Sequence, residues 1–134
     1  MKLAIRTFLV ALITFSVSSG AFAINPSEKV VKEARALVEA ASPDDWHTYA
    51  EAAQKCIVKG VNMKEASQWI KKSVEIRETS FNHKVLGDYY VANRLPEQAL
   101  EAYSKSIRLG YLEQDNYRDK ETQHKILALV MQLG

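Results

Sequence analysis

The stretch that decides the fold is LGDYYVANRLPEQALEAYSKSIRLG, from Leu86 to Gly110. The turn signal Asn93-Arg94-Leu95-Pro96 divides it into two helical patterns, because proline is favoured at the first position of a helix. Gly87 and Ala99 carry little side-chain bulk, one on each pattern, and Tyr103 lies one turn after Ala99. Small residues beside an aromatic side chain are typical of antiparallel helices that cross closely. The stretch therefore predicts a tightly packed helix pair.

A similar pattern occurs upstream, at an offset of 33 residues. That offset matches, without a gap, Ala66 with Ala99, Ile70 with Tyr103, Ser73 with Ser106 and Val74 with Ile107. A constant offset between similar segments indicates a repeated structural unit. One helix pair is therefore used at least twice, and no segment shows the sustained alternation typical of strands.

The second unit resembles the tetratricopeptide repeat, a family of stacked helix pairs with a period of about 34 residues. Leu86-Gly87, Tyr90, Ala99, Tyr103 and Ser106 stand where that family has its leucine-glycine, tyrosine, alanine, aromatic and small residues. The first unit departs from this pattern, because Ala53-Gln54 replaces leucine-glycine and Ile57 replaces the tyrosine. Its Ala66-x-x-Trp69 and Lys72-Ser73 also resemble the related Sel1-like repeats, whose units are longer.

The resemblance implies an all-α fold, with antiparallel helix pairs stacked as a short right-handed solenoid. It covers residues 43–134, and a separate N-terminal helix is expected within residues 24–42. Capping residues and glycines predict where helices begin and end. The expected helices run from Pro26 to Ala41, from the capping stretch Ser42-Pro43-Asp44-Asp45 to Lys59 before Gly60, from Met63 after the capping pair Asn62 and Glu65, from about Ser80, from Pro96 to Gly110, and after Asp115.

Residues 1–23 have the pattern of a secretory signal peptide. Lys2 and Arg6 precede an apolar run from Phe8 to Val17, and Ala21-Phe22-Ala23 supplies the small-x-small cleavage motif. The alternative is an uncleaved membrane anchor, but the apolar run is about half of the roughly 20 residues that a bilayer requires. We therefore expect cleavage after Ala23 and export, to the periplasm in a Gram-negative cell, with no membrane association of the mature chain.

Charge and cysteine content argue against a nucleic-acid-binding protein and against a fold held by an internal disulfide. Without Lys2 and Arg6, the 18 basic residues fall to the number of acidic ones, 16, so the mature chain has no net charge to favour a nucleic-acid partner. Cys56 is the only cysteine, which rules out an internal disulfide and leaves an intermolecular one open. Its apolar neighbours predict that Cys56 is buried as a small core residue.

The sequence favours a non-enzyme, with no cofactor and no metal ion. His47, His83 and His124 lie on different predicted helices, without the His-x-x-x-His spacing of many metal sites, and each is expected at the surface. Trp46 and Trp69 lie among apolar residues at helical spacing, which predicts core packing. A metal- or thiol-dependent enzyme would instead bring two histidines, or a histidine and Cys56, within bonding distance.

The resemblance also implies a protein-binding groove, because the first helix of each unit lines the concave face in that family. The groove would bind an extended peptide or a helix of a partner protein. Its expected residues are Glu51, Lys55, Lys59, Phe81, Lys84, Asp88 and Arg118, accompanied by Thr48, Val58, Val91 and Lys125. These charges also fit an ordinary solvated surface.

The alternative function is a self-assembling structural module. Two units are near the minimum for a stable solenoid, so an uncovered terminal helix would favour a homodimer. The discriminating residues are Leu127, Val130 and Met131, on the last predicted helix. Exposure of their side chains favours assembly, whereas burial favours the adaptor.

Overall fold

A computed structural model describes residues 23–134. This part of the chain is helical and contains no strand. Six helices follow one another: α1 (Pro26–Ala40), α2 (Trp46–Lys59), α3 (Met63–Ile76), α4 (Ser80–Ala92), α5 (Pro96–Glu113) and α6 (Lys120–Leu133). Apart from Ala23, the predicted signal peptide lies outside the described residues. Within those residues, no helix is long and apolar enough to span a bilayer.

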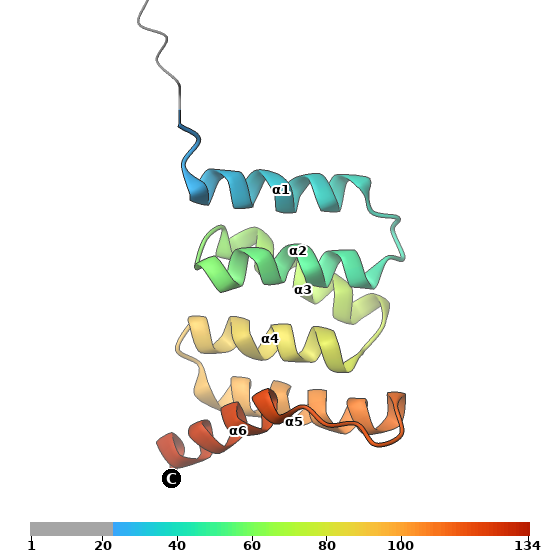
Figure 1. The fold of residues 1–134 in the computed structure, drawn as a ribbon, viewed down its shortest axis with the longest axis vertical. Helices are drawn as coiled ribbons and strands as arrows, with labels where there is room; N and C mark the ends of the chain where they lie inside the picture. Colours follow the sequence, from blue (N-terminus) through green and yellow to red (C-terminus); the bar gives the residue numbers. More distant parts are fainter. Residues whose placement is uncertain (1–22) are drawn as a thin grey trace, which may run out of the picture.

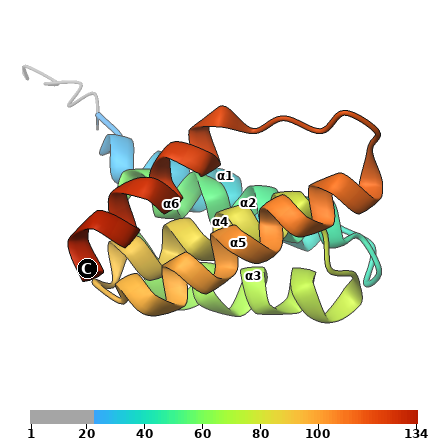
Figure 2. The same ribbon diagram turned by 90° about the horizontal axis from the view of Figure 1, so that it is seen from below.

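The helices are stacked along the long axis of the molecule (Figure 1). The pairs α2–α3 and α4–α5 are the most extensively packed, and α2 also contacts α4. Seen along the stack, α3 lies on one side of α2 and α4, whereas α1 and α6 lie on the other (Figure 2). Helices α2, α4 and α6 run in the same direction, so their carboxyl ends share one end of the molecule.

Equivalent residues of the two helix pairs make equivalent hydrogen bonds. The Ser73 hydroxyl donates to the carbonyl oxygen of Trp46 at 2.7 Å, and the Ser106 hydroxyl donates to that of Ser80 at 2.7 Å. Each bond joins the second helix of a pair to the first turn of the first helix. The offset of 33 residues between Ser73 and Ser106 is thus matched by a shared tertiary contact.

The start of α2 differs from the prediction. The Asp45 side chain caps the helix by accepting from the Thr48 amide at 3.0 Å and from the Thr48 hydroxyl at 2.7 Å, which lowers the pKa of the Asp45 carboxyl. The expected capping stretch begins three residues earlier, at Ser42, but the Ser42 carbonyl instead accepts from the Asp45 amide in a preceding turn. The helix begins at Trp46 because aspartate is an efficient cap for the third residue beyond it.

The expected capping pair Asn62 and Glu65 is also absent. Asn62 has a left-handed backbone (φ 51°), and its side chain makes no capping hydrogen bond to α3. Its amide instead donates to the Glu65 carboxylate at 2.8 Å. The same carboxylate accepts from Arg35 of α1 at 2.8 Å, so Glu65 links α1 to the start of α3.

Gly110 does not end its helix, contrary to the prediction. Helix α5 continues to Glu113, and a Cβ atom at the buried Gly110 would lie 2.2 Å from the ring of Tyr117. The glycine is required by this close approach rather than by a left-handed turn. The expected last helix begins later than Asp115, at Lys120, after the capping residue Asp119.

Gly87 makes the close approach that the sequence predicts. A Cβ atom there would lie 2.3 Å from the ring of Tyr103, so the absence of a side chain admits the aromatic ring between α4 and α5. The predicted left-handed glycine at the end of α2 is also confirmed, since Gly60 has φ 65°.

The core consists of two apolar clusters. The larger cluster is shared by helices α1, α2, α3 and α4, with Ile70 and Val85 at its centre. It contains Trp69 and the buried Cys56, as predicted. The smaller joins α5 and α6 through Ala99, Tyr103 and Leu129.

One histidine contradicts the expectation of surface positions. His47 and His124 are exposed, but the side chain of His83, in the first turn of α4, is buried. Its Nε2 lies 3.3 Å from the Glu78 carboxylate, while its Nδ1 has no hydrogen-bond partner among the described residues. Burial, aided by the charge of Lys105, lowers the pKa of His83.

Candidate binding groove

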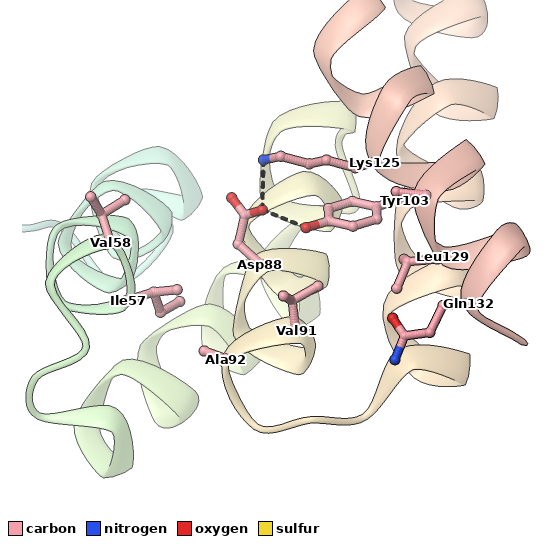
Figure 3. A pocket seen from close by; sticks show the side chains of 10 residues that line it. Ile57, Val58, Asp88, Val91, Ala92, Tyr103, Lys125, Leu129 and Gln132 are labelled. Carbon is pink, nitrogen blue, oxygen red and sulfur yellow. Dashed lines mark hydrogen bonds and ion pairs between the residues drawn. The ribbon is translucent and has the colours of Figure 1, made fainter.

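An open groove of about 510 Å³ lies between α2, α4 and α6 (Figure 3). Most of its lining is apolar, and the exposed side chains of Val58 and Val91 stand on it. The residues that line it are Ile57, Val58, Asp88, Val91, Ala92, Tyr103, Lys125, Ala128, Leu129 and Gln132. We call this site the α2–α4–α6 groove.

The groove is open because α6 rests on α5 rather than along α4. Leu129 and Ile126 of α6 pack with Tyr103 and Leu100 of α5, and direct packing between α4 and α6 is sparse. Helix α6 therefore forms one wall of the groove, while α2, α4 and the Tyr103 side chain of α5 form the rest.

Charged side chains span the gap between α4 and α6. The Asp88 carboxylate accepts from the Tyr103 hydroxyl at 2.5 Å and from Lys125 Nζ at 2.8 Å (Figure 3). Lys125 Nζ also lies 2.8 Å from the Glu121 carboxylate. Burial would lower the pKa of Lys125, but its hydrogen bonds to Asp88 and Glu121 outweigh burial and raise it. Burial and then Asp88 raise the pKa of Tyr103 well above its usual range.

A second contact joins the other end of α6 to α4. Lys84 Nζ lies 3.3 Å from the Asp119 carboxylate and 3.1 Å from that of Glu121. Burial would raise the pKa of Asp119, but hydrogen bonds from Thr122 and Lys84 lower it. Together, Lys84, Asp88, Asp119, Glu121 and Lys125 form what we call the α4–α6 ionic bridge.

The predicted groove residues separate into several environments. Asp88, Val58, Val91 and Lys125 do line the groove, whereas Lys84 belongs to the ionic bridge. The other expected positions lie elsewhere on the molecule.

Three of those positions face α1 instead. Lys55 and Lys59 line a depression of about 300 Å³ between α1 and α2, and Val58 contributes to both that depression and the groove. Glu51 and Lys55 line another depression against α1, of about 380 Å³. Helix α1 covers this flank of α2, which the repeat pattern did not predict.

Phe81, Arg118 and Thr48 make no contribution to the groove. Phe81 packs on the larger apolar cluster and stacks on His47, with ring centroids 5.3 Å apart. Arg118 is exposed in the loop before α6. The Thr48 hydroxyl is used to cap α2.

The sequence interpretation missed the α6 wall, apart from Lys125, and assigned Ile57 and Tyr103 to the core alone. One available signal is the motif Asp-x-x-Thr, which occurs as Asp45–Thr48 and again as Asp119–Thr122. Both copies make the same pair of hydrogen bonds, at 2.9 Å and 2.8 Å in the second. The shared cap marks α6 as the counterpart of α2 and aligns Gln132 with Val58.

The site contains paired charges and apolar side chains but no nucleophile next to a base. Within residues 23–134, no three His, Cys, Asp or Glu side chains gather as metal ligands. The polar groups of the groove are neutralised by one another, since Asp88 is held by Tyr103 and Lys125. Such a surface provides apolar contact area and a few fixed hydrogen-bonding groups.

Comparison with known proteins adds no relative. No family model, curated protein or solved structure matches this chain.

Proposed function

We propose that this protein is a non-catalytic helical-repeat module that binds a segment of a partner protein in the α2–α4–α6 groove. The proposal includes two tetratricopeptide-like units, α2–α3 and α4–α5, arranged as a short right-handed solenoid. It also includes export, to the periplasm in a Gram-negative cell, because residues 1–23 have the order of a signal peptide.

The groove itself is the observation that carries this proposal. Val58 and Val91 expose 69% and 47% of their surface on its lining, beside residues that are buried. Contiguous apolar surface of this kind, rimmed by charges, is typical of protein-interaction sites. An amphipathic helix is the best-fitting ligand, because a groove between helices accepts apolar side chains at three- and four-residue spacing.

The test places a photo-crosslinking amino acid at Val58 and, as a matched control, at exposed Arg118, outside the groove. We expect a discrete covalent adduct with a second protein from position 58 and none from position 118. A Val91→Glu substitution should abolish the adduct while leaving the helical circular dichroism unchanged, because a charge would be buried on binding. Equal crosslinking from both positions, or an adduct unaffected by Val91→Glu, would contradict the groove assignment.

A second candidate function is self-assembly, and one observation favours it. Leu127, Val130 and Met131 expose 56%, 48% and 76% of their surface on α6. By the expectation drawn from the sequence, exposure of these side chains favours self-assembly over the adaptor, through a homodimer formed by a terminal helix.

A further inference from the structure

Helix α6 presents three different faces. Thr122, Ile126 and Leu129 face the rest of the molecule and are buried or half-buried. The groove side carries Lys125, Ala128 and Gln132. Helical periodicity places Leu127 and Val130 on the far side of α6 from the groove, and Met131 beside Leu127 on the side that faces solvent. We call these three exposed residues the α6 stripe.

The α6 stripe is a separate surface from the proposed partner groove. It contains no groove-lining residue, and no helix within residues 23–134 covers it. Burial of large aliphatic side chains is favourable, so an uncovered stripe favours association.

The surroundings of the stripe indicate what covers it. From Ile126 to Leu133 the helix has no charged residue, so two copies of this half can pack without burying a charge. At the amino end of α6, Lys120 and His124 stand on the stripe side, whereas Glu121 is held on the bridge side by Lys84 and Lys125.

The carboxyl end of α6 complements those basic residues. Its last turn has no basic side chain to interact with the terminal carbonyl groups. A helix carboxyl end carries a partial negative charge that favours nearby cations. An antiparallel second copy of α6 would place Lys120 and His124 beside this end, and the same contact would recur by symmetry.

We propose that the α6 stripe binds a second copy of this chain, forming a two-fold homodimer with antiparallel α6 helices. Leu127 then packs against Val130 of the partner subunit, and Met131 lies beside the first turns of the partner's helix. This inference rests on the second candidate function and specifies its surface. The stripe is short compared with the roughly 800 Å² per partner of a standard interface, so the dimer dissociates on dilution.

Sedimentation equilibrium of the protein expressed from its full sequence tests the proposal. We expect the weight-average mass to rise from one toward two copies with concentration for the wild type. Leu127→Glu and Met131→Glu should weaken dimerisation at least about tenfold, because each buries a charge in the interface. A wild type that stays monomeric at millimolar concentration, or variants that dimerise as the wild type does, would overturn the proposal. Circular dichroism checks that these exposed substitutions leave the fold intact.

Cysteine crosslinking tests the orientation independently. Cys56 is fully buried, and a Cys56→Ala background removes its thiol from the reaction. Under mild oxidation Leu127→Cys/Val130→Cys should form a covalent dimer, because the antiparallel register brings these positions together. Gln132→Cys, on the groove side of the same helix, should remain monomeric. If only Gln132→Cys formed a covalent dimer, the two copies would meet on the groove side of α6, and the proposal would be overturned.

The stripe and groove proposals can fail separately. Val58→Glu changes the groove and should leave the sedimentation behaviour unchanged. Leu127→Glu changes the stripe and should leave crosslinking from position 58 to a partner protein unchanged. Loss of dimerisation in Val58→Glu, at unchanged helix content, would mean that self-association uses the groove instead.

Discussion

Helix α4 contacts α5 and α6 by different kinds of interaction, and the contrast explains the shape of the groove. Between α4 and α5, Gly87 and Ala99 allow close approach around the buried ring of Tyr103. Helix α6 adds the apolar contact of Leu129 on α5, and its link to α4 is the ionic bridge. Close packing leaves no space between helices, whereas long charged side chains span a gap. The groove is therefore present where charge replaces packing.

The strongest way to break the α4–α5 contact is Tyr103→Ala. Removing a large buried side chain creates a cavity, and we expect the free energy of unfolding to fall by about 3–5 kcal/mol in urea denaturation. Tyr103→Phe is the matched control, because it removes only the hydrogen bond to Asp88 and should cost about 1 kcal/mol. Equal losses for the two variants would show that the hydroxyl, not the ring, stabilises this contact.

The close approach itself is tested by Gly87→Ala. The added Cβ would lie 2.3 Å from a ring whose hydroxyl is tied to Asp88, so overpacking should cost about 1–3 kcal/mol. Gly60→Ala is a useful comparison, since its Cβ meets open space but its backbone is left-handed. That variant should lose about 1 kcal/mol through backbone strain alone. A Gly87→Ala protein as stable as the wild type would refute the close contact.

On the α6 side, Lys125→Met removes the central cation of the ionic bridge. The side chain is partly exposed, so we expect a modest local loss of about 1 kcal/mol. Hydrogen exchange should quicken several-fold in α6 and stay unchanged in α4 and α5. The same acceleration should follow from raising the salt concentration in the wild type. Uniform acceleration through all helices would show instead that α6 opens only with the whole fold.

The smallest expected effect is that of acidification, which acts on His83 of α4 and on Asp119 at the start of α6 in different pH ranges. Burial lowers the folded-state pKa of His83, so the unfolded chain binds a proton first, near pH 6.5. Stability is then present above pH 6.5 and declines below it, with a slope under about 1.4 kcal/mol per pH unit. The lowered pKa of Asp119 acts in a separate window, because its contribution is lost only below about pH 4. Urea titrations of His83→Gln should lack the upper slope, and an unchanged slope would assign it elsewhere.

Local signals predicted the elements of this fold. Pro96 begins α5, Gly60 ends α2 with a left-handed residue, and the all-helical class follows from the spacing of apolar positions. The expectation for Gly110 was wrong because a glycine near a helix end has two physical uses. The ring of Tyr117, from a later loop, decides between them, and sequence position alone does not.

The binding groove was less predictable, since long-range contacts position its α6 wall. Asp88 and Lys125 are 37 residues apart in sequence, and periodicity gives no information about such a pair. The burial of His83 has a similar origin, because it depends on neighbours outside its own helix. By contrast, the family resemblance implied that Asp88 and Val91 face a groove, and both side chains line the α2–α4–α6 groove.

The single thiol gives the fold a chemical consequence. Burial raises the pKa of Cys56, which keeps the group protonated and poorly nucleophilic while the helices are closed. Oxidants reach this thiol only when α2 opens, and such oxidants would be present in the oxidising compartment to which we propose that the chain is exported. The chain has no second cysteine to form an internal disulfide. The rate at which the Cys56 thiol is oxidised is therefore set by how often this part of the molecule opens, because the closed helices bury the group.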